Sequence, residues 1–60
     1  MKDLSEVPSQ IARIVANECL LRDLSLEAVG FGCISAEQYF LQGYSIAESI
    51  EYGIAAANLH

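Results

Sequence analysis

The sequence has few of the residues that small proteins use for cross-links and metal sites. Its 60 residues include two cysteines, one histidine, one proline and no tryptophan. A structural zinc ion needs about four ligands at set spacings, and Cys19, Cys33 and the terminal His60 are too few and too widely separated. We therefore predict no metal site and no cofactor. Both cysteines lie in segments with helical spacing, and we expect them to be buried free thiols.

Basic residues and long apolar runs are also scarce. Three basic against eight acidic residues give a formal charge of −5, which disfavours contact with phosphate backbones and therefore a nucleic-acid partner. The longest stretch without a charge, residues 38–47, is far shorter than the roughly 20 apolar residues that span a membrane. No signal peptide is evident at the N-terminus. We expect a soluble, cytoplasmic protein without a membrane partner.

Apolar residues are abundant and are spaced as in helices. The chain is 53% hydrophobic and 18% charged, which is too apolar for a disordered segment. No stretch alternates apolar and polar residues for long enough to indicate a half-buried strand. The sequence predicts an all-α fold in a single domain, residues 1–60, with three helices at about residues 8–22, 25–42 and 46–58.

Serine residues mark the beginnings of the first two helices. Ser5 or Ser9 is expected to cap the first helix, because a serine hydroxyl accepts a hydrogen bond from a free amide of the first turn. Pro8 is tolerated there, since amides of the first turn lack partners within the helix. Ser25 or Asp23 is expected to cap the second helix after a short turn.

The second helix is predicted to be continuous, although two glycines leave an alternative open. Gly30 and Gly32 each cost about 1 kcal/mol in a helix interior relative to alanine. A break there would let Ser35 restart the helix with a capping box. Gly43 is expected to end the helix in the left-handed conformation. Five apolar residues support a single helix because their steps are three, four, three and four: Leu26, Val29, Cys33, Ala36 and Phe40.

The third helix has an inward side made mainly of small and β-branched residues. Ser45 and Glu48 form a capping-box signal at its start. A chain of 60 residues has a small core, so we expect oligomerisation to add stability. The prediction is a homodimer or higher helical bundle, in which the following residues form the contact between copies: Ile46, Ile50, Gly53, Ile54 and Ala57.

No set of side chains in the sequence indicates catalysis. Glu48 and Glu51 share a face of the third helix, but no histidine or further carboxylate joins them at helical spacing, and a solvated face is the expected role. We predict that the protein is not an enzyme. Aromatic anchors and arginines favour binding surfaces, so the candidate residues for a partner or a ligand are Tyr39, Tyr44, Tyr52, Arg13 and Arg22.

One segment of about twenty residues resembles part of a known family. The stretch LQGYSIAESIEYGIAAANL is similar to the C-terminal helical segment of ribokinase-type sugar kinases. The resemblance implies a helix, a glycine turn and an alanine-rich helix. The family's Gly-Ala-Gly-Asp motif, whose aspartate is the general base, has Gly30-Phe31-Gly32-Cys33 as its nearest counterpart here. That segment has no carboxylate, so the resemblance extends to the helices and does not predict kinase activity.

Two functions are compatible with these features. The first is a small, acidic, self-associating helical protein that binds another macromolecule, most naturally another protein, as a regulator or inhibitor; phage-encoded inhibitors of host enzymes belong to this class. The second is an oligomeric protein that sequesters a small molecule in a pocket between subunits. In that case Tyr39 and Tyr44 would line the pocket, and Arg13 and Arg22 would bind a phosphate.

Overall fold

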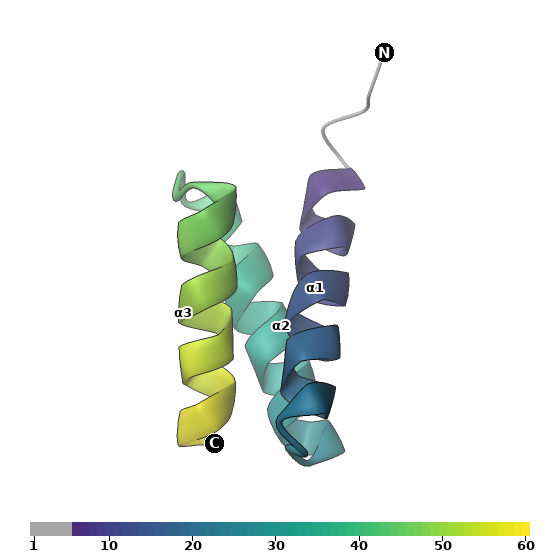
Figure 1. Cartoon of the computed structure of the whole chain (residues 1–60). Helices are drawn as coiled ribbons and strands as arrows, with labels where there is room; N and C mark the ends of the chain where they lie inside the picture. The colour runs from purple at the N-terminus through teal and green to yellow at the C-terminus, as the bar shows by residue number, and fades with distance from the viewer. Residues whose placement is uncertain (1–5) are drawn as a thin grey trace.

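The computed structural model of the chain describes residues 6–60, which form a three-helix bundle. Helix α1 spans Val7–Leu21, α2 spans Leu26–Leu41 and α3 spans Ile46–Leu59. Figure 1 shows α1 and α3 side by side with α2 behind them, and α2 makes more extensive contacts with each of them than they make with each other. The all-α prediction is confirmed, and each predicted helix end lies within one residue of the observed one.

The start of α1 differs from the prediction. Its N-cap is Glu6, whose side chain makes no capping hydrogen bond, and Pro8 lies in the first turn as expected. Ser9 is an exposed residue inside the helix, so the prediction that it caps α1 is wrong. Ser5, the other predicted cap, lies outside the described residues.

The two interhelical turns share one backbone motif. In the second turn, Gly43 has a φ of 106°, the Tyr44 amide donates to the Tyr39 carbonyl at 3.2 Å, and the Gly43 amide donates to the Phe40 carbonyl at 3.0 Å. This pair of hydrogen bonds is a Schellman motif, which satisfies carbonyls at a helix end. In the first turn, Asp23 has the left-handed φ of 61°, and the amides of Asp23 and Leu24 donate in the same pattern.

A serine follows each of these motifs and caps the next helix. The Ser25 hydroxyl accepts from the Ala28 amide at 3.2 Å, which selects Ser25 over Asp23 as the cap of α2. Ser45 and Glu48 form the predicted capping box, with the Ser45 hydroxyl accepting from the Glu48 amide at 3.1 Å and the Glu48 carboxylate accepting from the Ser45 amide at 3.3 Å. Both helices therefore begin where the sequence predicts.

Helix α2 is continuous through Gly30 and Gly32, as predicted. Close packing against α3 requires a residue without a side chain at Gly32. A Cβ placed on Gly32 would lie 2.8 Å from the Ala57 Cβ and 2.9 Å from the Gly53 carbonyl oxygen. A Cβ on Gly53 would lie 2.6 Å from the Ala36 Cβ. The two backbones thus approach more closely than side chains normally permit, and dispersion contacts offset the low helical propensity of glycine.

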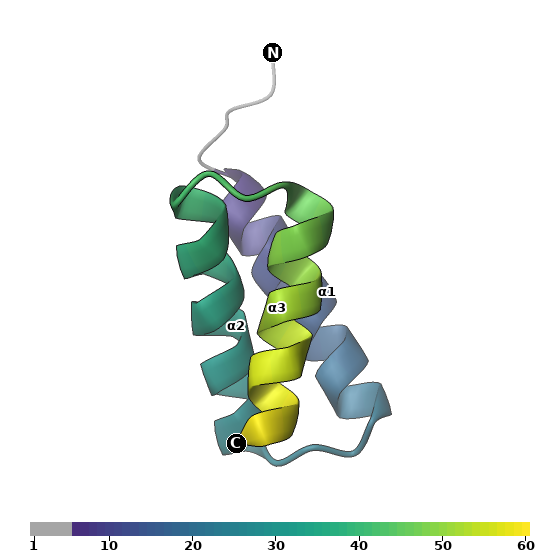
Figure 2. The same cartoon turned by 90° about the vertical axis from the view of Figure 1, so that its left-hand side faces the viewer.

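Small residues repeat every four positions along this α2–α3 contact. Figure 2 shows the two helices side by side along their length, and every residue of the repeat is buried. The repeat consists of Ala28, Gly32 and Ala36 on α2 and Ser49, Gly53 and Ala57 on α3. Ser49 was not expected in the core, but its hydroxyl donates to the Ser45 carbonyl at 2.8 Å, so no polar group is left unsatisfied there.

This contact corrects two of the predicted interface positions. Gly53 and Ala57 are buried against α2 of the same chain, so the structure places them in an intramolecular contact and not on a surface free for a second copy. Ile50 and Ile54 are partly buried and pack against the core, while Ile46 is 49% exposed. The sequence shows that this face is small, but it does not show which helix covers it.

The remaining core is made by α1 and by the inward side of α2. Ile11, Val15 and Cys19, one helical turn apart, are the buried residues of α1. Val29 and Ala36 are buried on α2, with Cys33 and Phe40 partly buried beside them, as the predicted spacing requires. Leu26 is the exception, since it opens α2 at the end of the bundle and is 81% exposed.

Candidate functional site

Three tyrosines from α2, the second turn and α3 come together on one side of the molecule. The ring centroids of Tyr39 and Tyr52 are 5.0 Å apart, those of Tyr39 and Tyr44 are 5.3 Å apart, and those of Tyr44 and Tyr52 are 5.6 Å apart. Tyr44 meets each of the other two rings nearly edge-on, an orientation that aromatic quadrupoles favour. We call these residues the tyrosine cluster.

The backbone of the second turn positions the cluster. The Schellman hydrogen bond from the Tyr44 amide to the Tyr39 carbonyl brings these two residues together, and contact between side chains at these two positions commonly accompanies the motif. The capping box at Ser45 then sets the direction of α3, and Tyr52 lies in the second turn of that helix. All three tyrosines were predicted from the sequence as candidate binding residues, and the structure shows that their rings are in contact.

The cluster is only partly covered. Tyr44 and Tyr52 are 39% and 43% exposed, and Tyr39 is half-buried. Within residues 6–60, no hydrogen bond involves a tyrosine hydroxyl. The cluster therefore offers ring faces and three polar groups that the described part of the chain does not use.

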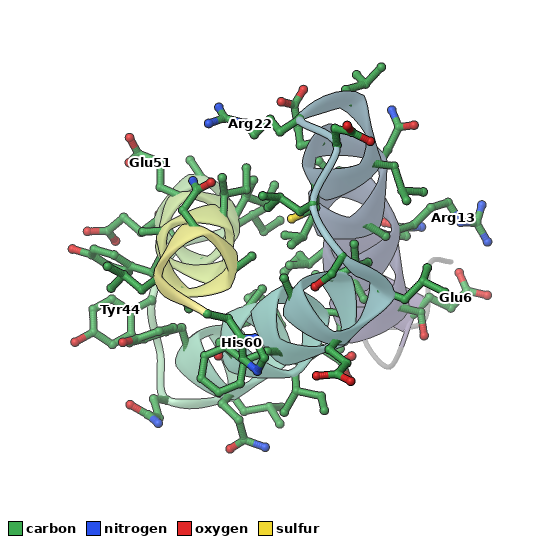
Figure 3. The ribbon with its side chains drawn as sticks, turned by 90° about the horizontal axis from the view of Figure 1, so that it is seen from below. Glu6, Arg13, Arg22, Tyr44, Glu51 and His60 are labelled. Atoms are coloured by element: carbon green, nitrogen blue, oxygen red, sulfur yellow. The ribbon has the colours of Figure 1, made fainter. Side chains whose placement is uncertain are left out.

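Two glutamates of α3 lie close to Tyr52 in the sequence. Glu48 lies four residues before Tyr52, so it is a neighbour of Tyr52 on the helix surface, and Glu51 adjoins Tyr52 in sequence. Both glutamates are exposed. Figure 3 shows Glu51 and Tyr44 projecting outward on the same side of the molecule. Glu48 also belongs to the capping box, whereas Glu51 makes no hydrogen bond or ion pair within the described residues.

The two candidate arginines are not part of this site. Figure 3 shows Arg13 on the side of the bundle opposite Tyr44, and it shows that Arg13 and Arg22 point in different directions. Arg22 lies 3.8 Å from the Glu18 carboxylate, an exposed pair one turn apart that contributes little stability. Within one chain the arginines do not converge, so a shared phosphate site would need more than one copy.

A second surface, on α2, was not predicted. Five exposed residues fall at steps of four, three, four and three on the side of α2 that faces away from the core: Glu27, Phe31, Ile34, Gln38 and Leu41. Phe31, Ile34 and Leu41 are 48%, 64% and 68% exposed. The His60 ring lies against Phe31, with centroids 5.2 Å apart. We call these five residues the outer face of α2; its spacing is visible in the sequence once the opposite side of the helix is examined.

The cysteines have no geometry that would activate them. Burial raises the pKa of the Cys19 thiol, with Arg22 opposing the shift, and burial likewise raises the pKa of the Cys33 thiol. The Cys33 thiol also donates to the Ala12 carbonyl, with Sγ and O 3.2 Å apart. Reactive cysteines have lowered pKa values, so both side chains act as packing residues. Both are free thiols.

No enclosed site is found in the part of the chain that the structure describes. Residues 6–60 contain no pocket and no group of three or more side chains suited to a metal ion. Across the same residues, no helix is both long and apolar enough to cross a membrane. No protein-family model matches this chain, and no curated protein or solved structure is significantly similar to it.

Proposed function

We propose that this chain is a self-associating helical protein that acts by binding another macromolecule and has no catalytic activity of its own. The observation that carries the proposal is the outer face of α2. Three large apolar side chains lie there at helical spacing, each about half exposed or more, on a helix whose opposite side already forms the core. Apolar patches of this kind mark interaction surfaces when they exceed scattered single residues.

The small core supports self-association. Among residues 6–60, the large aliphatic side chains that are fully buried are Ile11 and Val15, and much of the interior consists of alanine, glycine and cysteine. Burial of apolar surface contributes about 25 cal/mol per Å², so such a core contributes less than one built from leucine and phenylalanine. A second copy seated on the outer face of α2 would add the burial of Phe31, Ile34 and Leu41 to each subunit.

Binding of another protein is supported by the tyrosine cluster and by the charge of the chain. Partly exposed tyrosines are common anchors at protein interfaces. A net charge of −5 favours partners with basic surfaces, which suits a regulator or inhibitor. The two free thiols suit a reducing compartment, so the proposal places the protein in the cytoplasm.

Sedimentation velocity over a wide concentration range tests self-association. We expect the wild-type chain to form a dimer or larger assembly and Ile34→Asp to sediment as a monomer, because a charge at the centre of the outer face of α2 would be buried without a partner. Ile34 is exposed, so the variant should keep its helical circular dichroism.

Ile46→Asp is the matched variant for the alternative surface on α3. Ile46 is 49% exposed and belongs to the interface predicted from sequence. Dissociation by Ile46→Asp with no effect of Ile34→Asp would move the contact to α3. A wild-type chain that stays monomeric at every concentration would overturn the self-association proposal.

A further inference from the structure

The tyrosine cluster lies in a part of the chain that carries acidic residues and no basic side chain apart from the terminal histidine. Residues 26–60 contain Glu27, Glu37, Glu48 and Glu51 and neither lysine nor arginine. The described arginines belong to α1 and its C-cap, and Figure 3 places Arg13 on the opposite side from Tyr44. The ring faces and carboxylates of this surface therefore have no cation in the same region of the chain.

We propose that the tyrosine cluster, with Glu48 and Glu51, is the docking site for an arginine-bearing segment of a partner protein. The inference rests on the proposed function and identifies the surface and the chemistry of its partner. A guanidinium group stacks on a tyrosine ring and presents several N–H donors at once. The Glu51 carboxylate and the free tyrosine hydroxyls are acceptors for those donors.

The geometry selects this partner over a small cationic ligand. Cages for quaternary ammonium groups hold the cation between aromatic rings. Here the three ring centroids are only 5.0 to 5.6 Å apart, so the rings contact one another and leave no space for a methylated ammonium group between them. The absence of a pocket among residues 6–60 agrees with an open surface that a flat guanidinium can cover.

Charge also selects a basic segment over nucleic acid or a lysine-rich chain. Bases stack on aromatic side chains, but the flanking carboxylates repel phosphates. Lysine presents a compact and strongly hydrated ammonium group, which gains less than a guanidinium from stacking on a ring. An arginine-bearing peptide is therefore expected to bind more tightly than a lysine-bearing peptide of equal charge.

Tyrosine fluorescence provides a specific probe, because the sequence has no tryptophan and all three of its tyrosines belong to the cluster. A synthetic peptide of alternating arginine and glycine is titrated into the protein, and a lysine–glycine peptide of equal length serves as the control. We expect the arginine peptide to change the tyrosine emission and to bind about fivefold more tightly than the lysine peptide, as one stacking contact of about 1 kcal/mol implies.

Variants locate the binding site by calorimetry with the same arginine peptide. Tyr44→Ala and Glu51→Gln should each weaken binding about fivefold to tenfold. Glu6→Gln removes one negative charge at the start of α1, on the side of the bundle opposite Tyr44 (Figure 3), and is the matched control that should leave binding unchanged. Glu51→Gln is an exposed substitution, so it tests the site even if Tyr44→Ala perturbs the turn.

Two results would overturn the inference. Equal affinity for both peptides, with Glu6→Gln and Glu51→Gln equally weakened, would show attraction to the net charge alone. Tyrosine emission that changes when the protein alone is diluted, with no response to the arginine peptide, would mean that a second copy covers the cluster. Repeating the titration with Ile34→Asp separates the two proposals. If this variant is monomeric and still binds the arginine peptide, the docking site does not depend on self-association.

Discussion

Asp23 and Gly43 occupy the same position in equivalent turns but differ in how well they suit it. Both have a left-handed backbone, with φ of 61° and 106°. This conformation costs an L-residue about 1–2 kcal/mol through contact of its Cβ with the following carbonyl, and aspartate tolerates it better than most residues. The first turn therefore stores strain that the second turn avoids.

Replacement of Asp23 by glycine should stabilise the protein. We expect Asp23→Gly to raise the free energy of unfolding by about 1 kcal/mol, because glycine adopts the left-handed conformation without a steric penalty. Urea unfolding followed by circular dichroism measures the change. Gly43→Ala is the matched opposite and should lower stability by about 1 kcal/mol, since no atom lies within 4 Å of its added Cβ and strain is the only cost. A destabilised Asp23→Gly would contradict the assignment of strain.

The two cysteine thiols predict a loss of stability at alkaline pH. Burial raises the pKa of both thiols in the folded state, so folding favours the neutral form. Their contribution is fully present below the ordinary thiol pKa of about 8.5 and is lost as the pH rises through the higher folded-state values. Urea unfolding at about pH 7 and about pH 9.5 tests this. The Cys33→Ala variant should lose less stability over the same interval; an equal loss would show that the Cys33 thiol is not the cause.

At the scale of the helices, the α2–α3 contact is the feature that decides the architecture. Its close approach depends on Gly32 and Gly53, each of which lies against the backbone of the opposite helix. Gly30, two residues from Gly32, has no atom within 4 Å of an added Cβ and lies on the exposed side. Two glycines that look alike in sequence thus have opposite roles.

Alanine substitutions at Gly53 and Gly30 should change the free energy of unfolding in opposite directions. Gly53→Ala should destabilise the protein by about 2 kcal/mol, because its Cβ would force the two helices apart. Gly30→Ala should stabilise it by about 1 kcal/mol through helix propensity alone. Thermal unfolding resolves both, since 1 kcal/mol corresponds to about 4–8 °C in a domain of this size. If Gly53→Ala were neutral, the helices could separate without cost, and the close contact would not be a stabilising one.

At the scale of the whole molecule, the fold buries small side chains and leaves large ones exposed. Ala28, Gly32, Ala36, Gly53 and Ala57 are buried, whereas leucines at positions 20, 21, 26, 41 and 59 are 56% exposed or more. Most globular domains bury leucine in preference to alanine and glycine. Five of the eight large hydrophobic side chains that are exposed in residues 26–60 belong to two surfaces, the outer face of α2 and the tyrosine cluster.

Self-association predicts that thermal stability depends on protein concentration. Mass action stabilises the folded assembly, so the midpoint of unfolding should rise with concentration for the wild-type chain and stay constant for Ile34→Asp. Calorimetry at two concentrations that differ about a hundredfold measures the shift. A concentration-independent midpoint for both chains would indicate that the folded unit is a monomer.

The three helices and their approximate ends could be predicted from the sequence, although the residue that caps α1 could not. Capping serines, a glycine after α2 and apolar spacing act within a few residues of one another, so their effects can be predicted locally. The sequence also identified Tyr39, Tyr44 and Tyr52 as candidates for binding. The contact of Gly53 and Ala57 with α2 and the meeting of the three tyrosines became apparent from the packed helices. Those facts depend on which helix covers which face, and that choice is made by packing between residues distant in sequence.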